Sequence, residues 1–251
     1  MKKIIPFFIF AVFIFAVTSC SVYEDVYFKK DGTVSYSLEF DASALMTMLP
    51  VSGSASPIPN DTVISLTQIL EEKKDSLQFL REEELAIIEN VKPLQMRITN
   101  DTIQKTLFFN ISGDFENAEA LNRAFNTLNE ISAKSKTEKN VGENLISGNV
   151  PDTDFNSNYA WDGRIMKRIV VREKPVVDDV SEESSREEEQ MKMLFSNGKM
   201  FVRYHFPERV KKVSNTDALF SQDGKTVVLE YPSATYLNPT AEKLNIEIEI
   251  E

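Results

Sequence analysis

Alternation of apolar and polar side chains is the clearest pattern near the start of the chain. From Thr33 to Phe40 every second residue is apolar or aromatic, and residues 22–28 are rich in β-branched and aromatic side chains. Such alternation puts one face of a strand in a core and the other in water. The two segments flank residues 29–32, where Asp31-Gly32 favours a tight turn. The pattern predicts an antiparallel hairpin.

The same reasoning locates the remaining elements. A second hairpin is expected from residues 94–99 and 104–111, and further strands at 159–172, 199–206, 226–231 and 244–250. Apolar residues recur every three or four positions at 66–80 and 115–131, which is typical of amphipathic helices, and a short helix should follow Asp41 or Ser43. The first stripe could alternatively bind a partner. Polar or Pro-rich and Gly-rich composition predicts loops at 50–60 and 134–157 and an acidic linker or helix at 178–190.

Together these elements predict a fold of the α+β class. We expect a mainly antiparallel sheet built from hairpins, with amphipathic helices packed on one face. A single extracytoplasmic domain would span residues 20–251, and a division into two subdomains near 134–157 remains open.

The first nineteen residues have the layout of a secretory signal peptide. Lys2 and Lys3 precede an apolar run over residues 4–17. As a helix that run would span about 21 Å, which is short of the roughly 30 Å hydrocarbon core of a bilayer. A cleaved signal therefore fits better than a permanent membrane span.

Val17-Thr18-Ser19-Cys20 resembles the bacterial lipobox, an aliphatic residue and two small ones before cysteine. The resemblance implies lipid on the Cys20 sulfur, cleavage before Cys20 and acylation of the new amino group, which together anchor a protein firmly. The alternative is an uncleaved signal anchor that extends through residues 18–22. We prefer lipidation because Cys20 is the single cysteine of the sequence. Ser21 after it favours the outer membrane over the inner one under the usual sorting rule.

Net charge and cysteine content limit which partners and which covalent cross-links are expected. Loss of Lys2 and Lys3 with the signal changes the net charge from −11 to −13, which disfavours binding to nucleic acid. One cysteine rules out an intramolecular disulfide, so the exported domain must be stable through its core. The expected partners are the membrane, through the lipids on Cys20, and a lipid, glycan or envelope protein.

Four segments beyond Cys20 carry a resemblance to a known family: residues 28–36, 71–76, 206–210 and 214–227. With the lipidated cysteine they resemble Bacteroidota-type lipoproteins and, more distantly, the LppM-type lipoprotein domain. The resemblance implies an envelope-facing α+β domain, and the mycobacterial relatives imply a lipid or glycolipid ligand. The pattern differs from theirs in having no membrane helix before Glu251. Cys20 is the functional residue that the resemblance carries over.

No catalytic set is expected. His205 is the single histidine and lies within a predicted strand, and no Gly-x-Ser-x-Gly motif supplies a strained nucleophile. One histidine and a lipidated cysteine cannot assemble a typical zinc site. No cofactor is indicated.

Two weak candidates for binding sites remain. Asp152, Asp154, Asn156 and Asn158 resemble the start of a Ca²⁺ loop, although Ser157 replaces the turn glycine and Gly163 the closing glutamate. Tyr159, Trp161 and Arg164 could form a platform for a sugar or lipid if they are exposed, although such aromatic residues more often belong to a core.

The sequence therefore favours a lipid-anchored envelope protein that is a non-catalytic binding or scaffold module. A carrier with an apolar cavity for a lipid or glycolipid is one alternative. A carboxylate-dependent hydrolase is another, because sequence spacing says nothing about the distance between two carboxylates.

Overall fold

The computed structural model describes residues 20–48, 61–65, 67–68, 89–137, 157–171, 198–237 and 240–251. The signal segment, the expected loop at 50–60, most of the expected helix at 66–80 and the acidic segment at 178–190 lie outside the described residues. The elements are β1 (Ser21–Phe28), β2 (Val34–Asp41), α1 (Ser43–Met48), β3 (Thr62–Ser65), β4 (Leu94–Asp101), β5 (Thr106–Phe115), α5 (Ala118–Thr137), β6 (Ser157–Trp161), β7 (Ile165–Val170), β8 (Lys199–His205), β9 (Val210–Val213), β10 (Leu219–Phe220), β11 (Thr226–Pro232), α7 (Ala234–Leu237), α8 (Ala241–Leu244) and β12 (Ile246–Ile250).

The β1–β2 hairpin is confirmed. Gly32 has a φ of +88°, which glycine adopts without strain, and the Asp31 side chain accepts hydrogen bonds from both the backbone N–H (3.0 Å) and the hydroxyl (2.7 Å) of Thr33. The apolar residues of β2 point inward as the alternation predicted.

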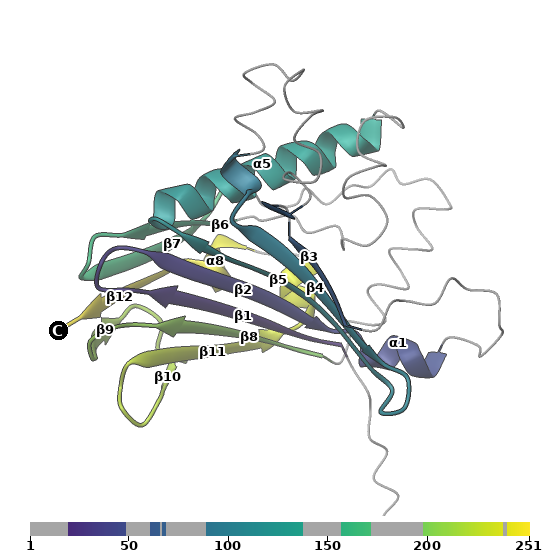
Figure 1. The fold of residues 1–251 in the computed structure, drawn as a ribbon. Helices are drawn as coiled ribbons and strands as arrows, with labels where there is room; N and C mark the ends of the chain where they lie inside the picture. Colours follow the sequence, from purple (N-terminus) through teal and green to yellow (C-terminus); the bar gives the residue numbers. More distant parts are fainter. Residues whose placement is uncertain are drawn as a thin grey trace, which may run out of the picture.

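The larger sheet has eight strands among the described residues, in the order β10-β11-β8-β1-β2-β5-β4-β3 (Figure 1). Neighbouring strands are antiparallel except β1 and β8, which run parallel at the centre of the sheet. This confirms the expected α+β class with a mainly antiparallel, hairpin-rich sheet.

A second sheet of four strands, in the order β6-β7-β12-β9, was not predicted. The segment expected as one strand at 159–172 is a hairpin, in which Gly163 has a φ of +94° between β6 and β7. The Asp162 side chain accepts the backbone N–H groups of Arg164 (2.8 Å) and Ile165 (2.7 Å) and so holds the turn. The expected strand at 244–250 begins at Ile246 and joins this second sheet, because Leu244 ends the short helix α8.

The long helix α5 begins three residues later than its apolar stripe predicted. Phe115 is the last residue of β5, and Asn117 caps the helix by accepting the backbone N–H of Ala120 (2.8 Å). Leu121 and Phe125 are buried, and in Figure 1 the helix lies beside β6 of the smaller sheet. No helix among the described residues is long and apolar enough to cross a membrane.

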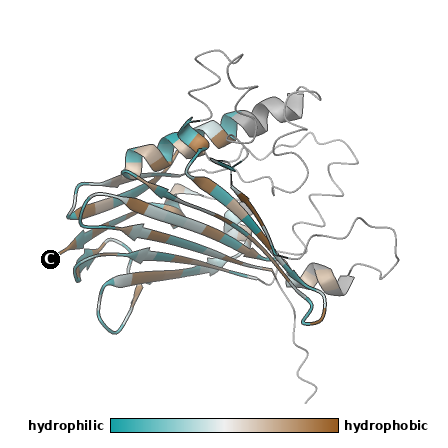
Figure 2. Cartoon of the chain, in the orientation of Figure 1, coloured by the Kyte–Doolittle hydropathy of each residue, from teal (hydrophilic) through white to brown (hydrophobic). Residues whose placement is uncertain are grey.

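One large core joins the two sheets and α5. It contains inward residues of β1, β2, β8 and β11 together with residues of β6, β7, β12 and α5, from both sides of the segment at 134–157. Hydrophobic and hydrophilic residues alternate along the strands (Figure 2). The inner face of the larger sheet is thus covered, and the residues between those of the core point from its opposite, outer face.

Candidate functional site

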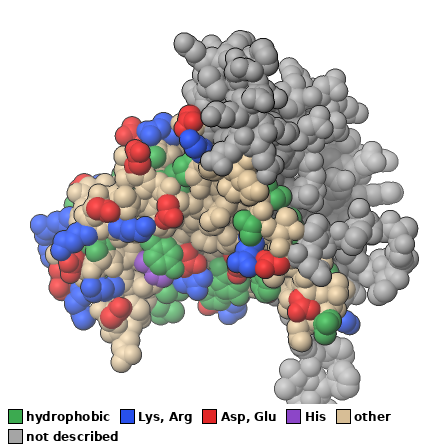
Figure 3. All heavy atoms as spheres, viewed as in Figure 1, with side chains coloured by type: hydrophobic (Ala, Val, Ile, Leu, Met, Phe, Trp, Pro, Cys, Tyr) green, Lys and Arg blue, Asp and Glu red, His purple; other side chains and the backbone are tan. Residues whose placement is uncertain are grey.

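A cluster of aromatic and charged side chains lies on the outer face of the two central strands. β1 contributes Tyr23, Asp25 and Tyr27, and β8 contributes Phe201, Arg203 and His205, the residues that alternate with those of the core. Parallel pairing sets Tyr23 opposite Phe201, Asp25 opposite Arg203 and Tyr27 opposite His205. We call these six residues the outer-face cluster. Hydrophobic, acidic and basic side chains lie next to one another on this side of the molecule (Figure 3).

Two stacked ring pairs frame the cluster. The rings of Tyr23 and Phe201 are 5.4 Å apart and 8° from parallel, and those of Tyr27 and His205 are 4.0 Å apart and 6° from parallel. The Arg203 guanidinium lies 5.5 Å from the centre of the Tyr23 ring, which is within the range of a cation–π contact. Tyr27 is 42% exposed, so an aromatic surface is open to solvent here.

Asp25 contacts Arg203, which lies over the Tyr23 ring, and His205, which stacks on Tyr27. Arg203 Nη2 lies 2.5 Å from Asp25 Oδ2, and His205 Nε2 lies 2.9 Å from Asp25 Oδ1. Burial raises the pKa of the Asp25 carboxyl, but the hydrogen bonds from His205 and Arg203 outweigh it, so that the pKa is lowered overall. The carboxylate is therefore held in its charged form by two donors.

The Thr226 hydroxyl, next to the cluster, forms a chain of contacts with the His205 imidazole and the Asp25 carboxylate. His205 Nδ1 lies 3.2 Å from the Thr226 hydroxyl on β11, and the tautomer that donates from Nε2 to Asp25 leaves Nδ1 to accept from Thr226. A nucleophilic hydroxyl also needs donors for a developing oxyanion. The Thr226 backbone N–H already donates to Ser221 Oγ (2.9 Å), and both Asp25 oxygens are engaged. The arrangement fits recognition of a polar group better than acyl transfer.

Glu39 extends the charged surface onto β2, where it pairs with Tyr23 of β1. Burial raises the pKa of its carboxyl, and the nearby carboxylates Asp41 and Asp25 raise it further. Two carboxyl groups with opposite pKa shifts are typical of glycosidase sites. Here Asp25 is bound by His205 and Arg203, which hold it in one orientation within the cluster.

The opposite face of β1 carries a buried polar network. Glu24 Oε2 lies 2.8 Å from Arg168 Nη1 of β7, and Glu24 Oε1 accepts the hydroxyls of Tyr159 (2.6 Å) and Tyr36 (3.2 Å). Arg168 also donates to Tyr204 Oη (3.1 Å) and to Ser157 Oγ (3.0 Å). Because Glu24 and Arg168 are 3% and 5% exposed, this network joins the two sheets and is closed to ligands.

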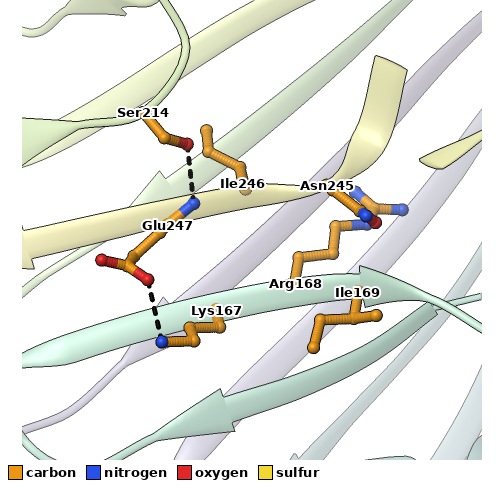
Figure 4. A pocket seen from close by; sticks show the side chains of 7 residues that line it. All are labelled: Lys167, Arg168, Ile169, Ser214, Asn245, Ile246 and Glu247. Atoms are coloured by element: carbon orange, nitrogen blue, oxygen red, sulfur yellow. Dashed lines mark hydrogen bonds and ion pairs between the residues drawn. The ribbon is translucent and has the colours of Figure 1, made fainter. Parts of the chain in front are cut away.

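A shallow depression of about 260 Å³ lies on the outer face of the smaller sheet (Figure 4). Lys167 Nζ and Glu247 Oε2 are 2.9 Å apart across it, and the Glu247 backbone N–H donates to Ser214 Oγ (2.9 Å). Its polar groups thus bind one another. Among the described residues no group of three or more His, Cys, Asp or Glu side chains is arranged to hold a metal ion.

Cys20 is joined directly to the first residue of β1. Its side chain is buried (4% exposed), and burial together with the charge of Asp41 raises the pKa of the thiol. A Cβ atom placed on Gly198 would lie 1.6 Å from the Cys20 carbonyl oxygen, so glycine is required where β8 begins. A buried thiol with a raised pKa is a poor nucleophile, so any modification of the sulfur would precede folding of β1.

The three residues predicted for a sugar or lipid platform lie in different environments and share no common surface. Tyr159 is 3% exposed and bonded to Glu24, so its ring offers no surface. Trp161 packs against the stacked rings of Phe28 and Phe206, at ring distances of 5.3 and 5.8 Å. Arg164 is exposed at the β6–β7 turn, where it pairs with Glu249 (3.0 Å).

Of the calcium candidates, Asp152, Asp154 and Asn156 lie outside the described residues, so this site stays a prediction. Asn158 belongs to β6, next to the buried Ser157.

Comparison with known proteins gives one weak similarity of fold. No family model matches the chain, and no curated protein matches it. The solved NMR structure of the folded domain of LppM from Mycobacterium tuberculosis is similar, with a TM-score of 0.40 and 8% sequence identity over 93% of this chain and 90% of that one. Neither a family nor a function follows from a similarity of this size. The Bacteroidota type stays a prediction.

Sequence reasoning missed the outer-face cluster. It placed His205 in a strand and expected no partner of catalytic type, and the side chains of β1 that face it are about 180 positions away along the chain. Tyr23, Asp25 and Tyr27 alternate with Val22, Glu24 and Val26, a local signal that could have placed the three on one strand face. The parallel pairing of β1 with β8, which brings Arg203 and His205 to them, leaves no local signal.

Proposed function

We propose that this chain is a lipid-anchored protein of the cell envelope that acts as a non-catalytic binding module through the outer-face cluster. The observation that carries the proposal is the direct connection of Cys20 to β1, a central strand of the larger sheet. Lipids on Cys20 would hold that strand at the membrane surface with no intervening linker.

The connection also orients the cluster. β1 runs from Ser21 to Phe28, so Tyr27 lies about 20 Å along the strand from the anchor, at 3.3 Å per residue. The outer face then stands upright from the lipid surface, and Tyr27 and His205 lie at its far end. An envelope partner can reach this face without displacing lipid.

We favour binding over catalysis because the exposed ring of Tyr27 lies beside charged side chains of fixed geometry. The Asp25 carboxylate contacts both Arg203 and His205, and the backbone N–H of Thr226 donates to Ser221 Oγ. Preformed charges beside exposed aromatic rings are typical of recognition surfaces, in which aromatic residues and arginine contribute most of the affinity. The carrier alternative needs an apolar cavity, whereas Glu24, Arg168 and three tyrosines occupy the described space between the sheets.

Lipidation is tested by metabolic labelling with radioactive palmitate in a bacterial host that processes lipoproteins. The wild-type chain should be labelled and fractionate with membranes, and Cys20→Ser should be neither labelled nor anchored. Ser21 predicts that the label appears in the outer-membrane fraction. Equal labelling of both chains would refute the anchor.

The binding surface is tested by photo-crosslinking in the same cells. A benzophenone amino acid at position 27 should give a discrete cross-linked product. Ile169, which is 52% exposed on the outer face of the smaller sheet, is the matched control position and should give none. If the chain is lipidated and neither position yields a product, the binding role of the outer-face cluster is wrong.

A further inference from the structure

The hairpin between β4 and β5 projects from the same end of the sheet as Cys20. The register aligns Ser21 with Asp41 and Asp41 with Phe108, and the backbone N–H of Ala42 donates to the Leu107 carbonyl (2.8 Å). The tip, residues 102–105, therefore extends about three residues beyond the level of Cys20, or about 10 Å at 3.3 Å per residue. In Figure 1 this hairpin lies beside α1, at the end where β1 begins.

The tip presents an isolated apolar side chain. Ile103 is 87% exposed, the highest value among the large hydrophobic residues of the described chain. Thr102, Gln104 and Lys105 around it are exposed as well. Exposed apolar residues scattered over a surface need no explanation, but this one lies at the tip of a hairpin that extends past the level of Cys20.

The hairpin is held firmly at its base and in its turn. Ala42, Ile98 and Leu107 form a small second core, against which Met46 and Phe109 pack. The Asp101 carboxylate accepts the backbone N–H groups of Ile103 (2.8 Å) and Gln104 (2.9 Å). A defined tip can present Ile103 to a surface without the entropy cost of ordering a loop.

The charges at this end suit a lipid surface. The tip carries Asp101, whose carboxylate accepts the N–H groups of the turn, and the exposed Lys105, so it is neutral overall whereas the chain as a whole is strongly acidic. Lys199, at the start of β8, is paired with Glu230 (2.6 Å). A basic residue beside an apolar one matches the boundary between anionic headgroups and acyl chains.

From this placement we infer that the β4–β5 hairpin inserts Ile103 into the membrane surface and fixes the orientation of the anchored domain. The inference rests on the proposed lipidation of Cys20. The tip lies two or three strand spacings from β1, roughly 10–15 Å, because β2 and β5 come between them. The hairpin would therefore give the domain a second contact with the membrane beside the anchor. The anchor supplies a high local concentration of lipid, so a contact that is weak on its own becomes populated.

The test uses the full chain produced with its signal segment, carrying Ile103→Cys and a fluorescent nitrobenzoxadiazole label. The protein is reconstituted in phosphatidylethanolamine vesicles that contain a minority of phosphatidylglycerol and of nitroxide-labelled phospholipid. Leu219→Cys is the matched control, because Leu219 is 63% exposed on the edge strand β10, where the register places it level with Asp25 and away from the Cys20 end of the sheet. Gln104→Cys is a second label position within the tip.

The labels at 103 and 104 should emit at shorter wavelength and be quenched by the nitroxide, whereas the label at 219 should do neither. Intact mass of the denatured protein reports lipidation separately: a mass without the lipids on Cys20 overturns the proposed function. In a lipidated, vesicle-bound protein, no quenching at 103, or equal quenching at 103 and 219, overturns the inference alone.

Discussion

Replacing Glu24 by glutamine should test the buried network most severely. The side chains of Glu24 and Arg168 are 4% and 6% exposed and their charged atoms are 2.8 Å apart, so Glu24→Gln leaves the Arg168 guanidinium buried without its counter-charge. Removing one partner of a buried ion pair costs about 3–5 kcal/mol. That is a large part of the about 5–15 kcal/mol by which folded proteins are stable.

Urea unfolding measures the effect. With a denaturant dependence of about 3 kcal/mol per molar for a chain of this size, the midpoint should fall by roughly 1–2 M. Glu247→Gln is the matched control, because the Lys167–Glu247 pair joins β7, the strand of Arg168, to its neighbour β12 and is about half exposed at both side chains. Its loss should cost only about 0–1 kcal/mol.

A double variant separates the charge from the packing. Glu24→Leu with Arg168→Met removes both charges, leaves no buried ion unpaired and should be more stable than Glu24→Gln alone. If Glu24→Gln shifts the midpoint no more than Glu247→Gln does, Glu24 and Arg168 do not form a buried pair in solution, and the proposed joint between the sheets is wrong.

Three further predictions concern other positions. Because its hydrogen bonds lower the pKa of Asp25, this carboxylate stabilises the fold above about pH 4 and its contribution is lost as pH falls through the lowered value; acid titration of stability should therefore be shallower for Asp25→Asn, and parallel curves would contradict the pairing. Burial raises the pKa of Tyr36, Tyr159 and Tyr204, so the free energy of unfolding should fall above about pH 10. In an ultraviolet titration these three tyrosines should ionise only when the chain unfolds; ionisation of every tyrosine near pH 10 in the folded protein would refute this. Gly198→Ala should lower the thermal midpoint much more than Gly163→Ala, since its new Cβ would meet the Cys20 carbonyl, whereas that of Gly163 meets no atom within 4 Å and incurs only the strain of its positive φ; equal losses would contradict the close approach of β8 to Cys20.

Elements that depend on neighbouring residues could be predicted from the sequence. The β1–β2 hairpin follows from alternation and from the Asp31-Gly32 turn, and α5 from its apolar spacing. The error at Phe115 has a physical cause. An aromatic residue at the end of a strand and the first apolar residue of a helix look alike when the cap, here Asn117, lies between them.

The smaller sheet could not be predicted in this way. Its strands β6, β7, β9 and β12 come from three separate parts of the chain, and β12 pairs with β7 about 80 residues earlier. The turn at Gly163 was also missed, because the residues before and after it favour strands. Which strands pair depends on the packing of the whole core, which no local window contains.

The sequence by itself determined the lipobox-like motif at Cys20, the β1–β2 hairpin with the alternating faces of β2, and the helix that covers the core, because turn geometry and side-chain periodicity act over a few residues. Only the tertiary structure decided that β1 pairs with β8, that Glu24 meets Arg168 inside while Asp25 meets His205 outside, and that the Ile103 hairpin shares an end with Cys20. Those contacts join residues about 80 to 180 positions apart. They form only when both sheets close on one core.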